Sequence, residues 1–333
     1  MPAALNRIKL WSIGGGKGGI GKSIVSLGLG ICLARLGKKV VLIDGDLGGA
    51  NLHTLMGVRY PQITLEHFLL KKVPRLEDTI IETSVEGIGL ICGADDILGA
   101  ANPTYAQKIR LLHQMEELPA QYIILDLGAG SSFNLLDFFN YSPGKIVLFT
   151  SQATSLQNAY GFLKSALYRK LSREFAKDDE MMQLLYQPGG DTGEGEPQSL
   201  PELLAYFKAA GSEQYERLSR SLWNFQLFLL VNMVKSKADL KSPEIIQSVC
   251  TDFLGIHPEI LGHLVYDPAV EAAVNQMVPF PLGQKKSPAA QELEEMARRI
   301  VKESRLPKGG WTTSQIPEEA EMPPGPLSAY PLS

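Results

Sequence analysis

The sequence predicts an α/β fold with three layers, in which a mostly parallel, twisted sheet carries helices on both faces. Two observations support this prediction. Short apolar runs alternate with segments of helical periodicity along the chain, as they do in successive βαβ units. In addition, runs such as VVLID, YIILD and KIVLFT are continuously apolar rather than alternating, which is typical of strands covered on both faces.

The expected elements follow from these patterns in chain order. Strands are the short runs rich in Val, Ile and Leu, and we expect them near residues 8–13, 39–43, 87–92, 122–127, 145–150, 225–231 and 260–265. Helices are the segments in which apolar residues recur every three or four positions, and we expect them near residues 23–36, 104–117, 155–171, 241–253, 268–276 and 287–304.

Two segments interrupt the scheme. Residues from about 172 to 221 are predicted to be an insertion, with a mobile acidic, glycine-rich loop at 189–197 and a helical part at 201–220. The stretch 305–333 is rich in Pro, Glu and Ser, and it predicts a disordered tail. We therefore expect one domain over residues 1–304, with this insertion inside it.

Composition argues against several classes of protein. A net charge of −4 gives no electrostatic footprint for nucleic acid, so DNA is not an expected partner. The three cysteines (Cys32, Cys92 and Cys250) lie far apart in apolar sequence without a CxxC pair, which argues against an iron–sulfur cluster and indicates buried, reduced thiols. No signal peptide or run of about 20 apolar residues is seen, so we expect a cytoplasmic protein.

The most informative motif is the glycine-rich segment 14–23, which follows the first expected strand and precedes the first expected helix. Residues 16–23 fit the P-loop pattern GxxxxGK[ST], in which backbone N–H groups wrap a triphosphate. In this pattern Lys22 neutralises the β- and γ-phosphate oxygens, and the Ser23 hydroxyl is a ligand for Mg²⁺. The predicted nucleotide-binding residues here are Gly16, Lys17, Gly18, Gly19, Ile20, Gly21, Lys22 and Ser23.

A second lysine, Lys17, turns the loop into the deviant form KGGxGK[ST], and with it the chain resembles the MinD/ParA family of P-loop ATPases. The resemblance implies that Lys17 reaches across a dimer interface to the phosphates held by the partner subunit. Charge supports this expectation, because a second cation beside Lys22 is costly to bury unless further phosphates meet it.

Two further motifs carry carboxylates to the expected strand ends. VVLIDGD ends with Asp44 and Asp46, and YIILDLGAG contains Asp126 and Gly128. Ligands of open α/β sheets collect at this edge, and acids beside a nucleotide imply a divalent cation between them. The resemblance assigns Asp46 to the attacking water and Asp44 and Asp126 to Mg²⁺, and it assigns the Gly128 N–H to the γ-phosphate.

The strand segment FLLVNMV carries Asn232, whose amide can pair with the donor and acceptor edge of adenine. The family uses this position for the base, and the Asn-Lys-x-Asp signature of typical GTPases is absent, so we expect ATP rather than GTP. A structural role for Asn232 as a cap at the strand end remains the alternative.

Within the family, the chain is most similar to the flagellar-number regulators called FlhG, FleN or YlxH. The segments GANLHTLMGV, ITLEHFL, LEDTI and TSQATSLQNAYGFLKSA carry this similarity, which covers roughly residues 8–170 and 222–304. The amphipathic membrane-targeting helix of such proteins is not evident. Residues 287–304 mix both signs of charge on the polar face, which suits a helix packed on its own domain. Peripheral attachment to the inner membrane stays open.

These observations predict a slow, partner-stimulated Mg²⁺-dependent ATPase that works as an ATP-switched dimer. Lys17, Lys22 and Asp46 are the expected catalytic residues, and ATP, Mg²⁺, a second copy of the chain and a protein activator or cargo are the expected partners. By resemblance its output is spatial or numerical control of a structure such as the flagellum or the division site. Two alternatives are a DNA-coating partition ATPase and a nucleotide-binding scaffold with negligible hydrolysis.

Overall fold

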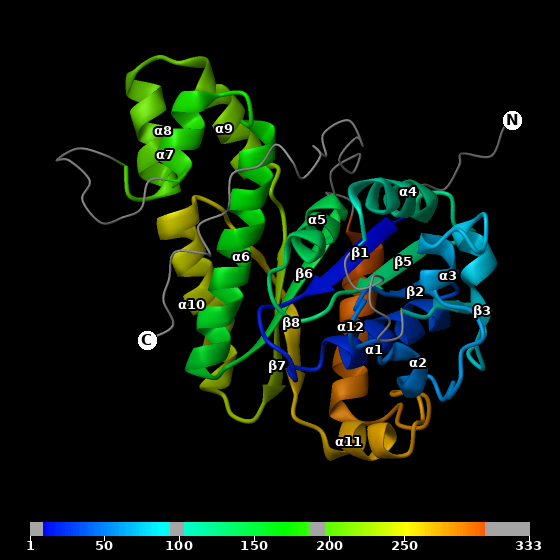
Figure 1. Ribbon diagram of the computed structural model, residues 1–333. Helices are drawn as coiled ribbons and strands as arrows, with labels where there is room; N and C mark the ends of the chain where they lie inside the picture. The colour runs from blue at the N-terminus through cyan, green and yellow to red at the C-terminus, as the bar shows by residue number, and fades with distance from the viewer. Residues whose placement is uncertain (1–8, 94–102, 187–196, 304–333) are drawn as a thin grey trace, which may run out of the picture.

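The computed structural model describes residues 9–93, 103–186 and 197–303, and it confirms the predicted α/β class (Figure 1). The sheet has eight strands in the order β3-β4-β2-β5-β1-β6-β7-β8. Strand β3 pairs antiparallel with β4, and the other pairings are parallel. The strands are β1 (Lys9–Gly14), β2 (Val40–Asp44), β3 (Ile81–Glu82), β4 (Ile88–Ile91), β5 (Tyr122–Asp126), β6 (Gly144–Thr150), β7 (Phe228–Val234) and β8 (Glu259–Val265).

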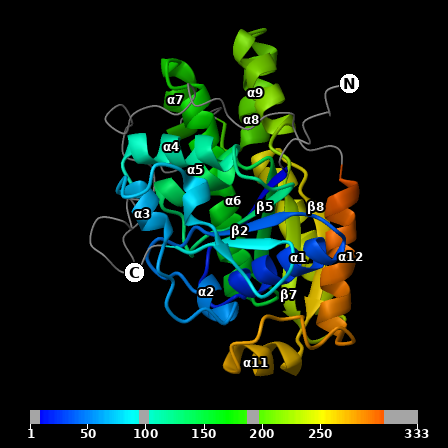
Figure 2. The ribbon, with the colours of Figure 1, turned by 90° about the vertical axis from the view of Figure 1, so that its right-hand side faces the viewer.

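Helices cover both faces of the sheet, as the continuously apolar strands require (Figure 2). One core cluster joins the sheet to α3 (Leu65–Leu69), α4 (Tyr105–Met115), α5 (Phe133–Tyr141), α6 (Ala153–Glu174) and α10 (Ser242–Val249). The other joins it to α1 (Lys22–Arg35), α2 (Leu52–Leu55), α11 (Pro268–Asn275) and α12 (Pro288–Lys302). Short turns of 3₁₀-helix at Leu76–Thr79 and Asp239–Lys241 and of π-helix at Cys250–Leu254 complete these elements.

Parallel pairing brings the motif residues to one edge of the sheet. Ile13 of β1 lies beside Asp126 of β5, and Asp126 lies beside Asp44 of β2. Farther along the sheet, Asn232 of β7 lies beside Thr150 of β6. Because the carboxyl ends of parallel strands share an edge, segments far apart in the sequence meet there.

The predicted insertion is helical over most of its described length, but it contains more helix than expected. Three helices, α7 (Asp179–Tyr186), α8 (Leu200–Ala209) and α9 (Glu213–Trp223), follow the end of α6 (Figure 1). The helical part expected at 201–220 forms two helices, α8 and α9, because the chain turns at Gly211, whose φ of 63° is left-handed. Of the acidic loop expected at 189–197, all but Pro197 lies outside the described residues, as does the tail at 305–333.

Polar contacts tie the insertion to the last turn of α6. The Ser221 Oγ of α9 donates to Glu174 Oε2 at 2.7 Å, and Lys170 Nζ lies 3.1 Å from the same oxygen. Arg217 Nη2 of α9 also donates to the Glu174 carbonyl at 3.0 Å. The three-helix insertion is therefore anchored where α6 ends.

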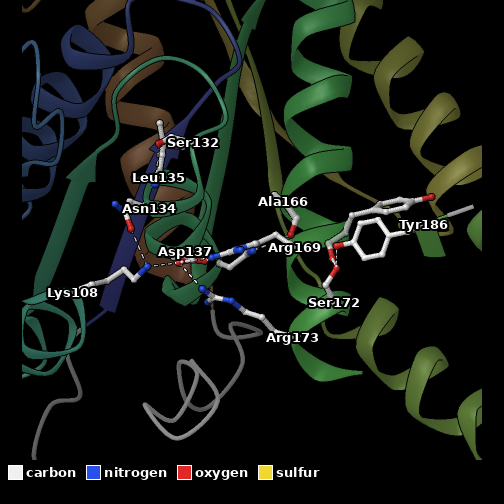
Figure 3. A network of polar contacts seen from close by, with 12 residues as sticks. Lys108, Ser132, Asn134, Leu135, Asp137, Ala166, Arg169, Ser172, Arg173 and Tyr186 are labelled. Atoms are coloured by element: carbon white, nitrogen blue, oxygen red, sulfur yellow. Dashed lines mark hydrogen bonds and ion pairs between the residues drawn. The ribbon is translucent and has the colours of Figure 1, made fainter. Parts of the chain in front are cut away.

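A buried ion-pair cluster joins three helices on the same face (Figure 3). Its centre is Asp137 of α5, whose Oδ2 accepts from Lys108 Nζ of α4 at 2.6 Å. Arg169 Nε of α6 donates to the other oxygen of Asp137 at 2.9 Å, and Arg173 Nη2 donates to Oδ2 at 2.5 Å. Asn134 accepts a second bond from Lys108 at 2.9 Å. The cluster fixes the helix after β5 against α4 and α6.

The helix expected near 287–304 is found as α12, and it packs on its own domain as its mixed charge predicted. Leu293, Met296 and Ile300 are buried against α1 and β8. None of the helices in the described part of the chain is long and apolar enough to cross a bilayer. The three cysteines are buried, and no disulfide joins them in the described part of the chain, in agreement with the prediction from their spacing.

Candidate nucleotide site

The loop between β1 and α1 is built on close backbone approaches that only glycine permits. A Cβ on Gly16 would lie 2.3 Å from the Asn158 carbonyl oxygen of α6, and one on Gly15 would lie 2.6 Å from the Leu148 oxygen of β6. Gly19 and Gly21 have left-handed φ angles of 74° and 90°. The run of glycines therefore follows from how tightly this turn is wrapped.

Most backbone N–H groups of this loop have no hydrogen-bond partner among the residues that the structure describes. There the N–H groups of Lys17, Gly18, Gly19, Gly21 and Lys22 donate no hydrogen bond, Gly18 and Gly19 form a turn, and the N-terminus of α1 has no side-chain cap. Such a row of free N–H groups at a helix N-terminus attracts anions. The geometry thus fits the phosphate cradle that the motif predicts.

The two lysines of the loop differ in their surroundings. Lys22 is 9% exposed, and its Nζ donates to the Lys17 carbonyl at 3.3 Å across the loop. Burial lowers the pKa of the Lys22 ammonium, whereas the charges of Asp126 and Asp46 oppose that shift. The side chain of Lys17 is exposed. Lys22 therefore serves its own loop, and Lys17 is free to reach outward.

Two carboxylates lie buried side by side beyond the loop. Asp44 accepts backbone N–H bonds from Asp46, Asn51 and Leu52 at 3.2, 2.9 and 3.0 Å, so it also holds the segment after β2 in place. Burial and the neighbouring Asp126 raise the pKa of Asp44 to about 7. Burial likewise raises the pKa of Asp126 to about 6, although hydrogen bonds from Ser23 and Ser26 oppose the shift.

This donor set suits a hard cation that is held mainly by phosphate and water. Among the described residues, no group of three or more His, Cys, Asp or Glu side chains is placed to bind a metal by itself. Mg²⁺ commonly takes one or two protein oxygens together with substrate phosphates and waters. Ser23, Asp44 and Asp126 therefore fit Mg²⁺ bound with a nucleotide.

The segments after β2 and β5 touch each other at Asp46. A Cβ on Gly128 would lie 3.0–3.1 Å from the carboxylate atoms of Asp46, and Gly48 N donates to Asp46 Oδ1 at 3.3 Å. Asp46 itself is half-buried. The residue predicted to act on water thus lies directly against the glycine predicted to face the γ-phosphate.

The side chain of Asn232 also contacts the glycine-rich loop, where it binds the main chain of Ile20. Its Nδ2 donates to the Ile20 carbonyl at 2.8 Å, and its Oδ1 accepts from Met233 N at 2.8 Å. The fold therefore brings together the glycine-rich loop, Asp44, Asp46, Asp126, Gly128 and Asn232 at one sheet edge.

Sequence reasoning missed one polar residue of the site. Ser26 is fully buried in α1, and its Oγ donates to Asp126 Oδ1 at 2.8 Å. Ser26 follows Ser23 by three positions, a spacing that puts both hydroxyls on the same helix face. This three-residue spacing was the signal in the sequence from which Ser26 could have been predicted as a site residue.

Comparison with known proteins finds relatives that are similar to part of the chain. Antiactivator FleN of Pseudomonas aeruginosa is 26% identical over 163 residues, covering 48% of this chain and 57% of FleN. Flagellum site-determining protein YlxH of Helicobacter pylori is 31% identical over 158 residues, covering 47% of this chain and 53% of YlxH. The chain thus spans about half the length of these curated relatives.

A solved structure shares the fold over a longer stretch. The septum site-determining protein MinD of Pyrococcus horikoshii, in complex with Mg-ADP, has a TM-score of 0.60 and 20% identity, covering 88% of this chain and 96% of MinD. The model of the CobQ/CobB/MinD/ParA nucleotide binding domain matches residues 11–280. The resemblance inferred from the loop and strand-end motifs is confirmed: the chain belongs to the CobQ/CobB/MinD/ParA family of nucleotide-binding domains, with FleN and YlxH among its relatives.

Proposed function

We propose that the protein is a Mg²⁺-dependent ATPase that works as an ATP-switched dimer and controls the position or number of a cellular structure. The observation that carries the proposal is the glycine-rich loop, in which the N–H groups of Gly18, Gly19, Gly21 and Lys22 donate no hydrogen bond within the described residues. The loop also contains the buried Lys22 and lies beside two buried carboxylates. Preorganised donors of this kind stabilise charge on a transferring phosphoryl group.

Each residue has a separate task in this proposal. The loop N–H groups and Lys22 hold the phosphates, while Ser23, Asp44 and Asp126 hold Mg²⁺, which neutralises charge on the β- and γ-phosphate oxygens. Asp46 orients the attacking water, and its contact with Gly128 keeps it beside the γ-phosphate position. Hydrolysis would then loosen the segments after β2 and β5 and release the dimer.

The exposed Lys17 supports the dimer. Lys22 already folds over its own loop, so an exposed second ammonium can reach phosphates bound by a partner subunit. Charge supplied in trans is an established means of accelerating phosphoryl transfer. A slow basal rate is expected, because no further catalytic base lies among the described residues of the site.

The names of the relatives support a regulatory output. One is called an antiactivator, another determines the site of the flagellum, and a MinD from Aquifex aeolicus has been solved in complex with MinC. For this chain we propose a protein activator or cargo of the same kind.

Two measurements test the proposal. Phosphate release from ATP should be slow but measurable in the wild type and fall at least ~10-fold in Asp46→Ala. Light scattering should detect ATP-dependent dimers in the wild type but not in Lys17→Ala, which should retain ATP binding. Equal, near-zero phosphate release by wild type and Asp46→Ala would favour a scaffold. ATP-dependent, salt-sensitive retention on nonspecific DNA would favour a partition ATPase, which the net charge of −4 argues against.

A further inference from the structure

The peptide group that joins Ile20 to Gly21 lies between two glycines, whose backbone conformations are weakly restricted. Gly19 and Gly21 flank Ile20, and both have left-handed φ angles, of 74° and 90°. Glycine populates several backbone conformations at little cost, so this peptide needs an external restraint if the loop is to be preorganised. Ile20 is 5% exposed, so its buried side chain fixes the Ile20 end of the peptide but not the Gly21 end.

Asn232 supplies that restraint from β7. Its Nδ2 donates to the Ile20 carbonyl at 2.8 Å, and it lies so close to the loop that a Cβ on Gly21 would come within 2.5 Å of it. In a planar trans peptide the carbonyl and the following N–H point in opposite directions. Holding the Ile20 oxygen toward Asn232 therefore directs the Gly21 N–H away from β7.

The end of β7 is shaped to hold Asn232 in this position. The register with β8 shifts between Val231 and Val234, and Met233 has a left-handed φ of 57°, which is uncommon for a residue other than glycine. The Met233 N–H donates to Asn232 Oδ1 at 2.8 Å. Both ends of the Asn232 amide are thus engaged by the chain itself.

We propose that Asn232 is a positioning residue of the phosphate-binding loop: it fixes the Ile20–Gly21 peptide so that the Gly21 N–H is presented to the nucleotide phosphates. This inference rests on the proposed nucleotide binding and deepens it. It differs from the prediction that Asn232 reads adenine, because a residue that orients the loop acts on the phosphates and not on the base.

The test compares ligands that share phosphates but differ in the base. Dissociation constants for ATP, GTP and inorganic tripolyphosphate, each with Mg²⁺, are measured by calorimetry for the wild type, Asn232→Ala, Asn232→Asp and Leu240→Ala. Asn232→Ala should weaken all three ligands by a similar factor of roughly 5 to 10, the size of one lost hydrogen bond. Leu240 is an exposed residue of the turn that follows β7, so Leu240→Ala keeps both hydrogen bonds of Asn232 and should bind tripolyphosphate like the wild type.

Asn232→Asp is the second variant, and it decides the matter if Asn232→Ala does not fold. It has the same shape and retains the acceptor for Met233 N–H, but it loses the donor to Ile20. We expect it to weaken all three ligands while leaving the ratio of ATP to GTP affinity unchanged. A loss confined to ATP, a shift of Asn232→Asp toward GTP, or unchanged affinity for all three ligands would overturn the inference. A wild type that binds none of the ligands would overturn the proposed function together with it.

Discussion

At the scale of single residues, the contact between Asp46 and Gly128 links two segments that the proposed ATPase must coordinate. A Cβ on Gly128 would lie 3.0–3.1 Å from the Asp46 carboxylate, which is tighter than ordinary van der Waals contact. We expect Gly128→Ala to displace that carboxylate and to lower phosphate release at least ~10-fold, with ATP affinity changed much less. Single-turnover phosphate release and calorimetric ATP binding would measure the two effects separately.

Gly48→Ala is the matched control for this substitution. Gly48 lies in the same segment as Asp46, but a Cβ there meets nothing within 4 Å, and its φ is not left-handed. Its N–H to Asp46 is kept in alanine. Gly48→Ala should therefore hydrolyse ATP like the wild type. Equal rates for Gly128→Ala and Gly48→Ala would show that the position of Asp46 does not limit hydrolysis.

The residues that bear local motifs could be predicted, whereas their long-range partners could not. Lys22, Ser23, Asp44 and Asp126 were found because residue type and spacing reveal them, and the parallel sheet places them at one edge. The bonds of Ser26 to Asp126 and of Asn232 to Ile20 join positions that are 100 and 212 residues apart. Such pairings depend on how the elements pack, and the spacing of Ser23 and Ser26 places both hydroxyls on one helix face without naming the residue that they meet.

At the scale of helices and strands, the cluster around Asp137 couples the helix after β5 to α4 and α6 (Figure 3). Burial alone would raise the pKa of Asp137, but the hydrogen bond from Arg169 and the charges of Arg173, Arg169 and Lys108 hold that pKa below its ordinary value. The carboxylate therefore contributes stability that is fully present above its unfolded-state pKa of about 4 and is lost as the pH falls through the depressed folded-state pKa.

We expect Asp137→Asn to lower the free energy of unfolding by about 3–5 kcal/mol at neutral pH, because three buried cations lose their shared carboxylate. The difference from the wild type should shrink below about pH 4, where the Asp137 carboxylate begins to be protonated in the unfolded state but not yet in the folded protein. Urea unfolding over a pH series would measure both. Asp78→Asn removes a surface ion pair with Arg75 and should change stability little at any pH. A difference for Asp137→Asn that is independent of pH would contradict this account.

The elements themselves show where periodicity succeeds and where it fails. The helices α4, α6 and α12 lie within a few residues of their expected bounds, because apolar residues recur along one face of each. Helix α1 is buried on all sides, and its position was predicted because it directly follows the glycine-rich motif. Helix α5 was missed: its sequence FNLLDFFNY is apolar on most sides, since it is buried between the sheet, α4 and α6. The strand expected at 225–231 occurs at Phe228–Val234, because its end at Asn232 and Met233 is set by pairing with β6 and β8.

At the scale of the whole molecule, the insertion shares its core with the rest of the chain. The core cluster that covers one face of the sheet continues through Phe175 at the end of α6 into Met181, Phe207 and Leu218 of α7 to α9. A Cβ on Gly255, beyond α10, would touch Leu222 of α9 and Pro201 of α8, so the insertion also contacts the edge of the main body. A shared core implies that the two parts unfold together.

This arrangement leads to a prediction about cooperativity, which also tests the expectation of one domain. Phe207 is fully buried in the insertion, so Phe207→Ala should cost about 3–5 kcal/mol. If the core is continuous, calorimetry of Phe207→Ala should show a single thermal unfolding transition, with a midpoint temperature several degrees below that of the wild type. Trp223→Ala in α9 is the control, since Trp223 is 77% exposed and its loss should leave the transition nearly in place. A second transition at lower temperature in Phe207→Ala, with the main one unmoved, would instead mean that α7 to α9 unfold separately from the nucleotide-binding body.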